Sequence, residues 1–143
     1  MSEFVERLEW LMSEHDLNKK MFAEKVHINS TCISHYLLEK RIPTVNSLIK
    51  MADYFNCSTD YLLGREEENY SHHFKECPPF CERIVFLKNK FGGKVDAFVA
   101  KAKIVRSSYF NWASGKFTPS LDNIICLADN LDCRVDYILG RES

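Results

Sequence analysis

Residues 106–111 carry side chains that are suited to reading the bases of nucleic acid. Arg106 can form two hydrogen bonds with guanine, and Asn111 can do the same with adenine. Phe110 can touch the methyl group of thymine, and Ser107 completes the set. This chemistry requires that all four side chains project from an exposed face of one element. The alternative interpretation is the ordinary solvated face of a helix.

A second, hydroxyl-rich set lies earlier in the chain, at Ser30, Thr31, Ser34 and His35. Serine and threonine read bases less specifically than arginine and asparagine do, so this set is the weaker reader. Basic side chains that can hold phosphates accompany both sets; they are Lys19, Lys40 and Arg41 around the first, and Lys94 and Lys116 around the second.

The two sets occupy equivalent places in an internal repeat. The tripeptide Gly-Arg-Glu occurs at Gly64-Arg65-Glu66 and again at Gly140-Arg141-Glu142, an offset of 76. With this offset, the two units align without gaps from Phe4-Val5-Glu6-Arg7 and Phe80-Cys81-Glu82-Arg83 onward. A unit of this length is long enough to fold as a small domain. An acidic run and Pro78-Pro79 mark a boundary between the units. We therefore expect one domain at 1–66, a linker at 67–79 and a second domain at 80–143.

The pattern of apolar residues in each unit predicts a series of short amphipathic helices. No segment alternates between apolar and polar residues for long enough to predict a strand. In the first unit we expect a first helix that ends near His15-Asp16, and N-caps for the later helices at Asn18, Asn29, Thr44, and Ser58 or Thr59. We expect a third helix over 30–38 with Ile33, Tyr36 and Leu37 facing inward, and a last helix over 60–63 that Gly64 ends. The expected fold class is all-α, with two tandem five-helix domains. The second and third helices, joined by a tight turn, have helix-turn-helix architecture.

The first unit resembles the lambda-repressor-like (Cro-type, XRE family) DNA-binding domain. The resemblance rests on residues 17–26, the turn, 33–36, Pro43, 48–55 and 60–66, and the second unit matches over 80–142. It implies that the third helix enters the major groove of double-stranded DNA while its neighbours hold phosphates. Single-domain relatives usually act as symmetric dimers, so a homodimer is a further expectation.

The units depart from the family pattern at several positions. Family members often have a phosphate-binding glutamine where this chain has Lys19 and Val95. They often have glycine at the turn, where this chain has His27 and Lys103. Val105 is also a poor cap beside its equivalent Asn29. One unit could therefore have drifted into a structural role.

The composition is that of an ordinary globular protein, with 45% hydrophobic and 27% charged residues among 143. No leader or membrane span is recognisable, so we expect a cytoplasmic protein with reduced cysteines. We expect Cys32, Cys57, Cys126 and Cys133 to be small buried hydrophobes. Net charge is −4 for residues 1–68 and +3 for residues 69–143. This asymmetry fits a surface that binds a polyanion, and it fits equally a solvated helical surface.

The chain shows no catalytic motif, so we expect neither an enzyme nor a cofactor. His72, His73, Cys77 and Cys81 could surround zinc, but their spacing is not that of a known ligand set, and chance clustering is the better interpretation.

The sequence thus predicts a DNA-binding transcriptional regulator, a repressor of bacterial or phage type. Because nothing follows Ser143, we expect regulation to come from abundance, a partner protein or assembly. The alternative is a protein-interaction or antitoxin-like module in which one domain no longer binds DNA.

Overall fold

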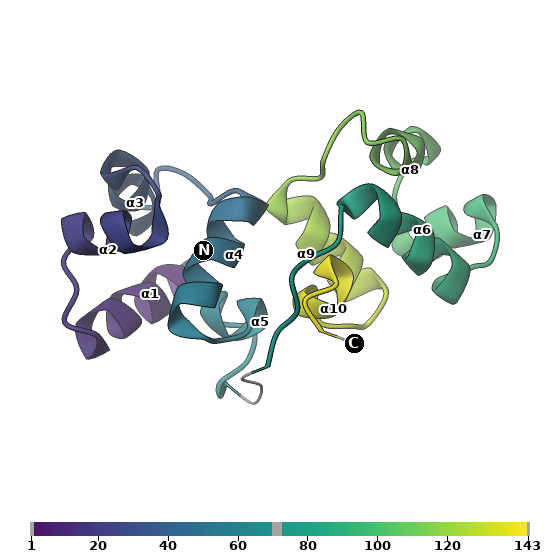
Figure 1. Cartoon of the computed structure of the whole chain (residues 1–143). Helices are drawn as coiled ribbons and strands as arrows, with labels where there is room; N and C mark the ends of the chain where they lie inside the picture. The colour runs from purple at the N-terminus through teal and green to yellow at the C-terminus, as the bar shows by residue number, and fades with distance from the viewer. Residues whose placement is uncertain (1, 70–72, 143) are drawn as a thin grey trace. The chain divides into compact units, whose positions relative to one another are not determined.

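The computed structural model describes residues 2–69 and 73–142 (Figure 1). Every regular element in these residues is an α-helix, in agreement with the all-α fold class expected from the sequence. The chain divides into two compact units, Met1–His73 and Phe74–Ser143. None of the helices within the described residues is long and apolar enough to cross a membrane.

The first unit contains five helices (Figure 1). These are α1 (Ser2–Glu14), α2 (Lys19–Val26), α3 (Ser30–Leu37), α4 (Val45–Phe55) and α5 (Thr59–Leu62). The expected caps are confirmed, because Asn18, Asn29, Thr44 and Ser58 each accept a hydrogen bond from a backbone N–H in the first turn of their helix. Each cap satisfies a donor that the helix itself cannot pair, which fixes where the helix begins.

The core of the first unit is built from the apolar stripe of each helix. Phe4, Leu8, Phe22, Ile33 and Leu48 are almost completely buried, and the ring of Phe22 stacks on Phe55 with 5.3 Å between centroids. Leu37 was expected to face the core but is only half-buried. The same core holds α2 against α3 and α4, and thereby orients the helix-turn-helix pair.

The second unit also contains five helices (Figure 1). These are α6 (Phe80–Phe91), α7 (Val95–Ala102), α8 (Arg106–Ala113), α9 (Leu121–Asn130) and α10 (Val135–Leu139). The helix pairs that pack together correspond to those of the first unit: α6 contacts α8 and α10, α7 contacts α8 and α9, and α9 contacts α10. Side-chain capping is sparser, since Ser120 caps α9 but Pro79, Lys94, Val105 and Arg134 form no cap hydrogen bond.

The recurring Gly-Arg-Glu tripeptide has the same structural role in both units. Gly64 and Gly140 have φ angles of +79° and +78°, and a Cβ at either position would lie 2.7 Å or less from a neighbouring side chain. The arginine that follows then pairs with the buried aspartate at the start of the last helix. Arg65 Nε lies 3.1 Å from Asp60 Oδ1, and Arg141 Nη1 lies 2.8 Å from Asp136 Oδ1.

A second arginine joins the first helix of each unit to the last. Arg7 Nη1 donates a hydrogen bond of 2.6 Å to the carbonyl of Tyr61, and its Cζ lies 3.9 Å from the centroid of that ring. Arg83 Nε donates equivalently to the carbonyl of Tyr137 at 3.0 Å, with Cζ 4.8 Å from the ring centroid. The recurrence of Phe-x-Glu-Arg in the sequence therefore corresponds to a repeated tertiary contact.

Parts of the segment 67–79, which the sequence presents as a linker, pack on the two units. Asn69 accepts a hydrogen bond from the backbone N–H of Ser58 and donates one to the carbonyl of Asn56. In the second unit, the N–H of Lys75 donates to the carbonyl of Arg141 at 2.8 Å, and the guanidinium of Arg141 lies over the ring of Phe74. These contacts extend each folded unit into the predicted linker.

Candidate nucleic-acid interface

A three-residue turn connects α2 to α3 in the first unit. His27 adopts the left-handed conformation with φ of +56°, and the N–H of Ile28 donates to the carbonyl of Ala23. Lys103 in the second unit has φ of +57° at the equivalent position. The absence of glycine therefore does not change the turn, although a left-handed conformation is unfavourable for a residue with a side chain.

The helix α3 presents a small, hydroxyl-bearing surface. Ser30 and Thr31 lie in its first turn and are exposed, whereas Ser34 and His35 are half-buried rather than fully outward-facing as the sequence suggested. Asn29 fixes this end of the helix, because its Oδ1 accepts a hydrogen bond of 2.7 Å from the N–H of Thr31. The surface available to a partner is therefore concentrated at the start of α3.

The basic residues expected to hold phosphates lie at the start of α2 and in the turn after α3. Lys19 is the first residue of α2, and Lys40 and Arg41 lie in the turn after α3; all three are exposed. Arg41 Nη1 donates to the Sγ atom of Cys32 at 3.8 Å, which directs it back toward α3. Within the described residues, Lys19 and Lys40 form no ion pair.

The corresponding surface of the second unit has a different chemistry. Arg106, Ser107 and Phe110 are exposed on α8, and Asn111 is half-buried. The guanidinium of Arg106 forms an ion pair with the carboxylate of Asp96 on α7 and lies 5.2 Å from the centroid of Phe110. The base-reading group that the sequence suggested is therefore held by a carboxylate in the unbound molecule.

The phosphate-holding candidates of the second unit are also exposed. Lys94 is the residue before α7, and Lys116 lies in the turn after α8, with Nζ 5.5 Å from the centroid of Phe117. Gly115 in that turn has φ of +78°, and its equivalent Glu39 adopts +58°. The turn after the third helix thus has the same backbone form whether or not glycine is present.

Two features of the second unit were not predicted from the sequence. One is the ion pair of Asp96 with Arg106. The sequence signal that could have indicated it is that Asp96 aligns with Lys20, so that this position carries opposite charges in the two units. Val105, Phe110 and Phe117 are all largely exposed, although only Phe110 had been considered a site residue. Their equivalents in the first unit are the polar residues Asn29, Ser34 and Arg41.

The tyrosine beneath this surface is part of the core. Tyr109 replaces Ile33 in the repeat, and burial raises the pKa of its hydroxyl above the usual range. Its ring makes edge contacts with Phe98 and Phe110, which connects the exposed face of α8 to the interior of the unit.

The cysteines and histidines do not form a metal site in the described residues, where no group of three or more potential ligands converges. His72, one of the four residues considered for zinc, lies outside the described residues. Cys57 is buried as expected, and Cys32 and Cys133 are half-buried. Cys126 is exposed, so the expectation that it is a small buried hydrophobe was wrong.

Comparison with known proteins supports the helix-turn-helix assignment for the first unit. A family model described as helix-turn-helix matches residues 8–62, which span α2, the turn and α3. The first unit therefore contains a helix-turn-helix domain.

Two curated proteins of Bacillus subtilis (strain 168) are similar to part of the chain. The HTH-type transcriptional regulator ImmR is 36% identical over 61 residues, which cover 43% of this chain and 48% of that protein. The uncharacterized HTH-type transcriptional regulator YobD is 29% identical over 65 residues, which cover 46% of this chain and 58% of that protein. The chain thus spans about half the length of the curated relatives it matches. No solved structure gave a significant match.

Proposed function

We propose that this protein is a sequence-specific transcriptional regulator that binds double-stranded DNA and acts as a repressor in a bacterial cytoplasm. The observation that carries the proposal is the capped α2–turn–α3 unit, with exposed Ser30 and Thr31 at the start of α3, exposed Lys19 at the start of α2 and exposed Lys40 in the turn after α3. The exposed, polar start of α3 is suited to enter a major groove, and the lysines on α2 and after α3 can hold the phosphates. The similarity to HTH-type transcriptional regulators supports the same function.

The second unit is proposed as a second reading domain. The support is its recurring helix packing and the position of Arg106, Ser107, Phe110 and Asn111 on α8. The ion pair between Arg106 and Asp96 is no strong obstacle, because both side chains are largely exposed and such pairs contribute little to stability. A DNA phosphate or a guanine can therefore compete with Asp96 for Arg106.

A protein-interaction role for the second unit is the alternative, and one observation favours it. Three exposed apolar side chains lie on α8 and beside it, namely Val105, Phe110 and Phe117, and phosphate contacts do not require them. Under this alternative the first unit alone would read DNA.

The test is the binding of the full chain to a fluorescent duplex of random sequence over a series of salt concentrations. We expect affinity to fall steeply with salt, and Lys19→Ala and Lys40→Ala each to reduce the log–log slope by about 0.9. Lys25→Ala is the matched control, because it removes the same charge from the last turn of α2 and should change the slope little. Equal slopes for all three variants would contradict the proposed interface.

A further inference from the structure

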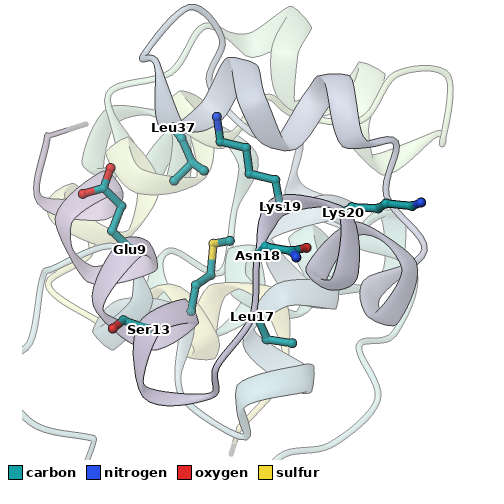
Figure 2. Close-up of a pocket in the computed structure, with 8 residues that line it drawn as sticks. Glu9, Ser13, Leu17, Asn18, Lys19, Lys20 and Leu37 are labelled. Atoms are coloured by element: carbon teal, nitrogen blue, oxygen red, sulfur yellow. The ribbon is translucent and has the colours of Figure 1, made fainter.

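A pocket of about 730 Å³ opens on the first unit between α1, the start of α2 and the end of α3 (Figure 2). This volume lies within the range of small-molecule sites, which are usually apolar with a few polar groups at defined positions. It is formed within one unit, so its geometry depends only on the packing of these three helices.

The lining of the pocket combines an apolar base with charges of both signs. Met12 is 6% exposed, and Leu17 and Leu37 are half-buried, so the apolar groups are partly open to a ligand. Figure 2 shows Glu9 on the α1 side, Lys19 and Lys20 on the α2 side, and Leu37 between Glu9 and Lys19. Within the described residues these three charged side chains form no ion pair, and each is exposed.

The internal repeat shows that the fold does not require this lining. Leu37 is replaced by Ala113 in the second unit, and Met12 by Lys88, yet the corresponding helices still pack together. Glu9 is replaced by Val85, and the adjacent lysines by Val95 and Asp96. A half-buried leucine at position 37 also leaves apolar surface in water that alanine would avoid. The pocket chemistry is therefore particular to the first unit.

We propose that the pocket binds a short apolar peptide with free termini, its side chains on Met12 and Leu37, its carboxylate at Lys19, and its ammonium at Glu9. Lys19 and Glu9 provide partners for the two ends of such a zwitterion, whereas the side chain of Lys20 points away from Leu37 and Glu9 (Figure 2). A peptide of a few residues fits the volume. A neutral apolar ligand would leave these partners unused, and an inorganic anion would leave the apolar base unused.

The regulatory consequence rests on the proposed function. Lys19 is also proposed as a phosphate contact, so a bound peptide carboxylate and a DNA phosphate compete for the same ammonium group. Binding of one ligand must then weaken the other by the same factor, because coupling between two sites is reciprocal. The pocket would make the first unit a repressor domain that a small peptide releases from DNA.

The binding test uses the full chain labelled with ¹³C at the methionine methyl groups, titrated with Leu-Leu-Leu. Met12 lies in the pocket, whereas Met51 is completely buried elsewhere in the core, and Met21 is 43% exposed outside the pocket. We expect saturable shifts at Met12 and not at Met51 or Met21. Glu9→Gln and Lys19→Gln should each weaken the titration several-fold, and the N-acetylated, C-amidated peptide should bind less tightly than the free one.

The controls separate a specific site from general hydrophobic adsorption. Val85→Ala changes the position of the second unit that is equivalent to Glu9 and should leave the titration unchanged. The proposed site would be overturned if the shifts at Met12 did not saturate. It would also be overturned if the titration curve were the same for the wild type, the Glu9 and Lys19 variants and the blocked peptide.

A second titration tests the coupling to DNA. Saturating Leu-Leu-Leu should raise the dissociation constant of the duplex by on the order of tenfold, and Glu9→Gln should reduce that effect without weakening DNA binding in the absence of peptide. A peptide that binds at Met12 but leaves the duplex affinity unchanged would overturn the regulatory role. If the chain binds no duplex at all, the proposed function fails, while the methyl titration still decides the peptide site.

Discussion

At the scale of single residues, the ion pair with Asp96 changes the base-reading role that an arginine at position 106 suggests. An arginine at the start of an exposed helix is suited to guanine, but here a carboxylate from α7 already occupies it. The same carboxylate also brings a negative charge to the side of the unit where a phosphate would bind. Asp96 is therefore expected to oppose DNA binding in two ways.

We predict that Arg106→Ala and Asp96→Asn have opposite effects on DNA binding. Arg106→Ala should cost about 1–3 kcal/mol at the specific site if Arg106 reads a guanine. Asp96→Asn should strengthen binding, because it frees the guanidinium and removes a repulsion. Anisotropy titrations on selected and random duplexes measure both. If Arg106→Ala lowered the affinity for the two duplexes equally, Arg106 would contact a phosphate and not a base.

The repeated aspartate–arginine pairs allow a second prediction at this scale. Asp136 and Arg141 are both completely buried, whereas the side chain of Arg65 is 27% exposed beside Asp60. Removing one partner of a buried pair leaves an uncompensated charge and costs about 3–5 kcal/mol. We therefore expect Asp136→Asn to destabilise the second unit strongly, and Asp60→Asn to destabilise the first unit less.

The two tryptophans provide separate probes for this comparison. Trp10→Phe introduces the residue found at the equivalent Phe86 and leaves Trp112 to report on the second unit. Trp112→Tyr introduces the residue found at Tyr36 and leaves Trp10 to report on the first. Urea unfolding followed by fluorescence then measures each unit within the full chain. Equal losses for both aspartate variants would contradict the role given to burial.

At the scale of elements, capping distinguishes the two third helices. Asn29 accepts a hydrogen bond from the first turn of α3, whereas Val105 has the extended backbone of a capping residue but no acceptor group. A missing cap leaves backbone N–H groups to water and allows the first turn to fray. Since the candidate base-reading residues Arg106 and Ser107 lie in the first turn of α8, capping bears on the proposed DNA binding as well as on stability.

We predict that reciprocal changes at these caps shift stability in opposite directions. Asn29→Ala should destabilise the first unit by about 1 kcal/mol, and Val105→Asn should stabilise the second by a similar amount. Urea unfolding with the matching tryptophan probe provides the measurement. A stabilisation by Val105→Asn accompanied by tighter DNA binding would show that order in α8 limits recognition; no change in stability would mean that water already satisfies these donors.

At the scale of the whole molecule, two unlike third helices belong to one chain. The third helix of each unit carries a different set of candidate base-reading residues at equivalent positions. These are Ser30, Thr31, Ser34 and His35 in the first unit, and Arg106, Ser107, Phe110 and Asn111 in the second. If both units read DNA, covalent connection raises the effective concentration of the second after the first has bound. The combined site should then contain two different half-sites rather than a palindrome.

We predict that selection from a random duplex pool yields an asymmetric site for the full chain, or that asymmetric unit twice if the chain forms a homodimer. Ser30→Ala together with Thr31→Ala should relax specificity in one half-site, and Arg106→Ala should relax it in the other. A short palindrome that is indifferent to Arg106→Ala would support the alternative in which α8 binds a protein partner.

The sequence alone was sufficient to predict the all-α class, the caps of the first unit and the helix-turn-helix. These features depend on interactions within a few residues, such as Asn18 with the N–H of Met21, and on the apolar period of each helix. The repeated Gly-Arg-Glu was visible in the sequence too, although its reason was not. That reason is an ion pair between the arginine and the aspartate five residues before it, buried in the second unit and partly buried in the first.

Other properties were decided only when the helices packed together. Asp96 and Arg106 lie on different helices, so their pairing depends on how α7 crosses α8. The pocket likewise requires α1, α2 and α3 at one place, and Leu37 changes from an expected core residue to a half-buried one because packing leaves that space open. Helical periodicity predicts which side of a helix is apolar, but only tertiary packing determines which part of that side is covered.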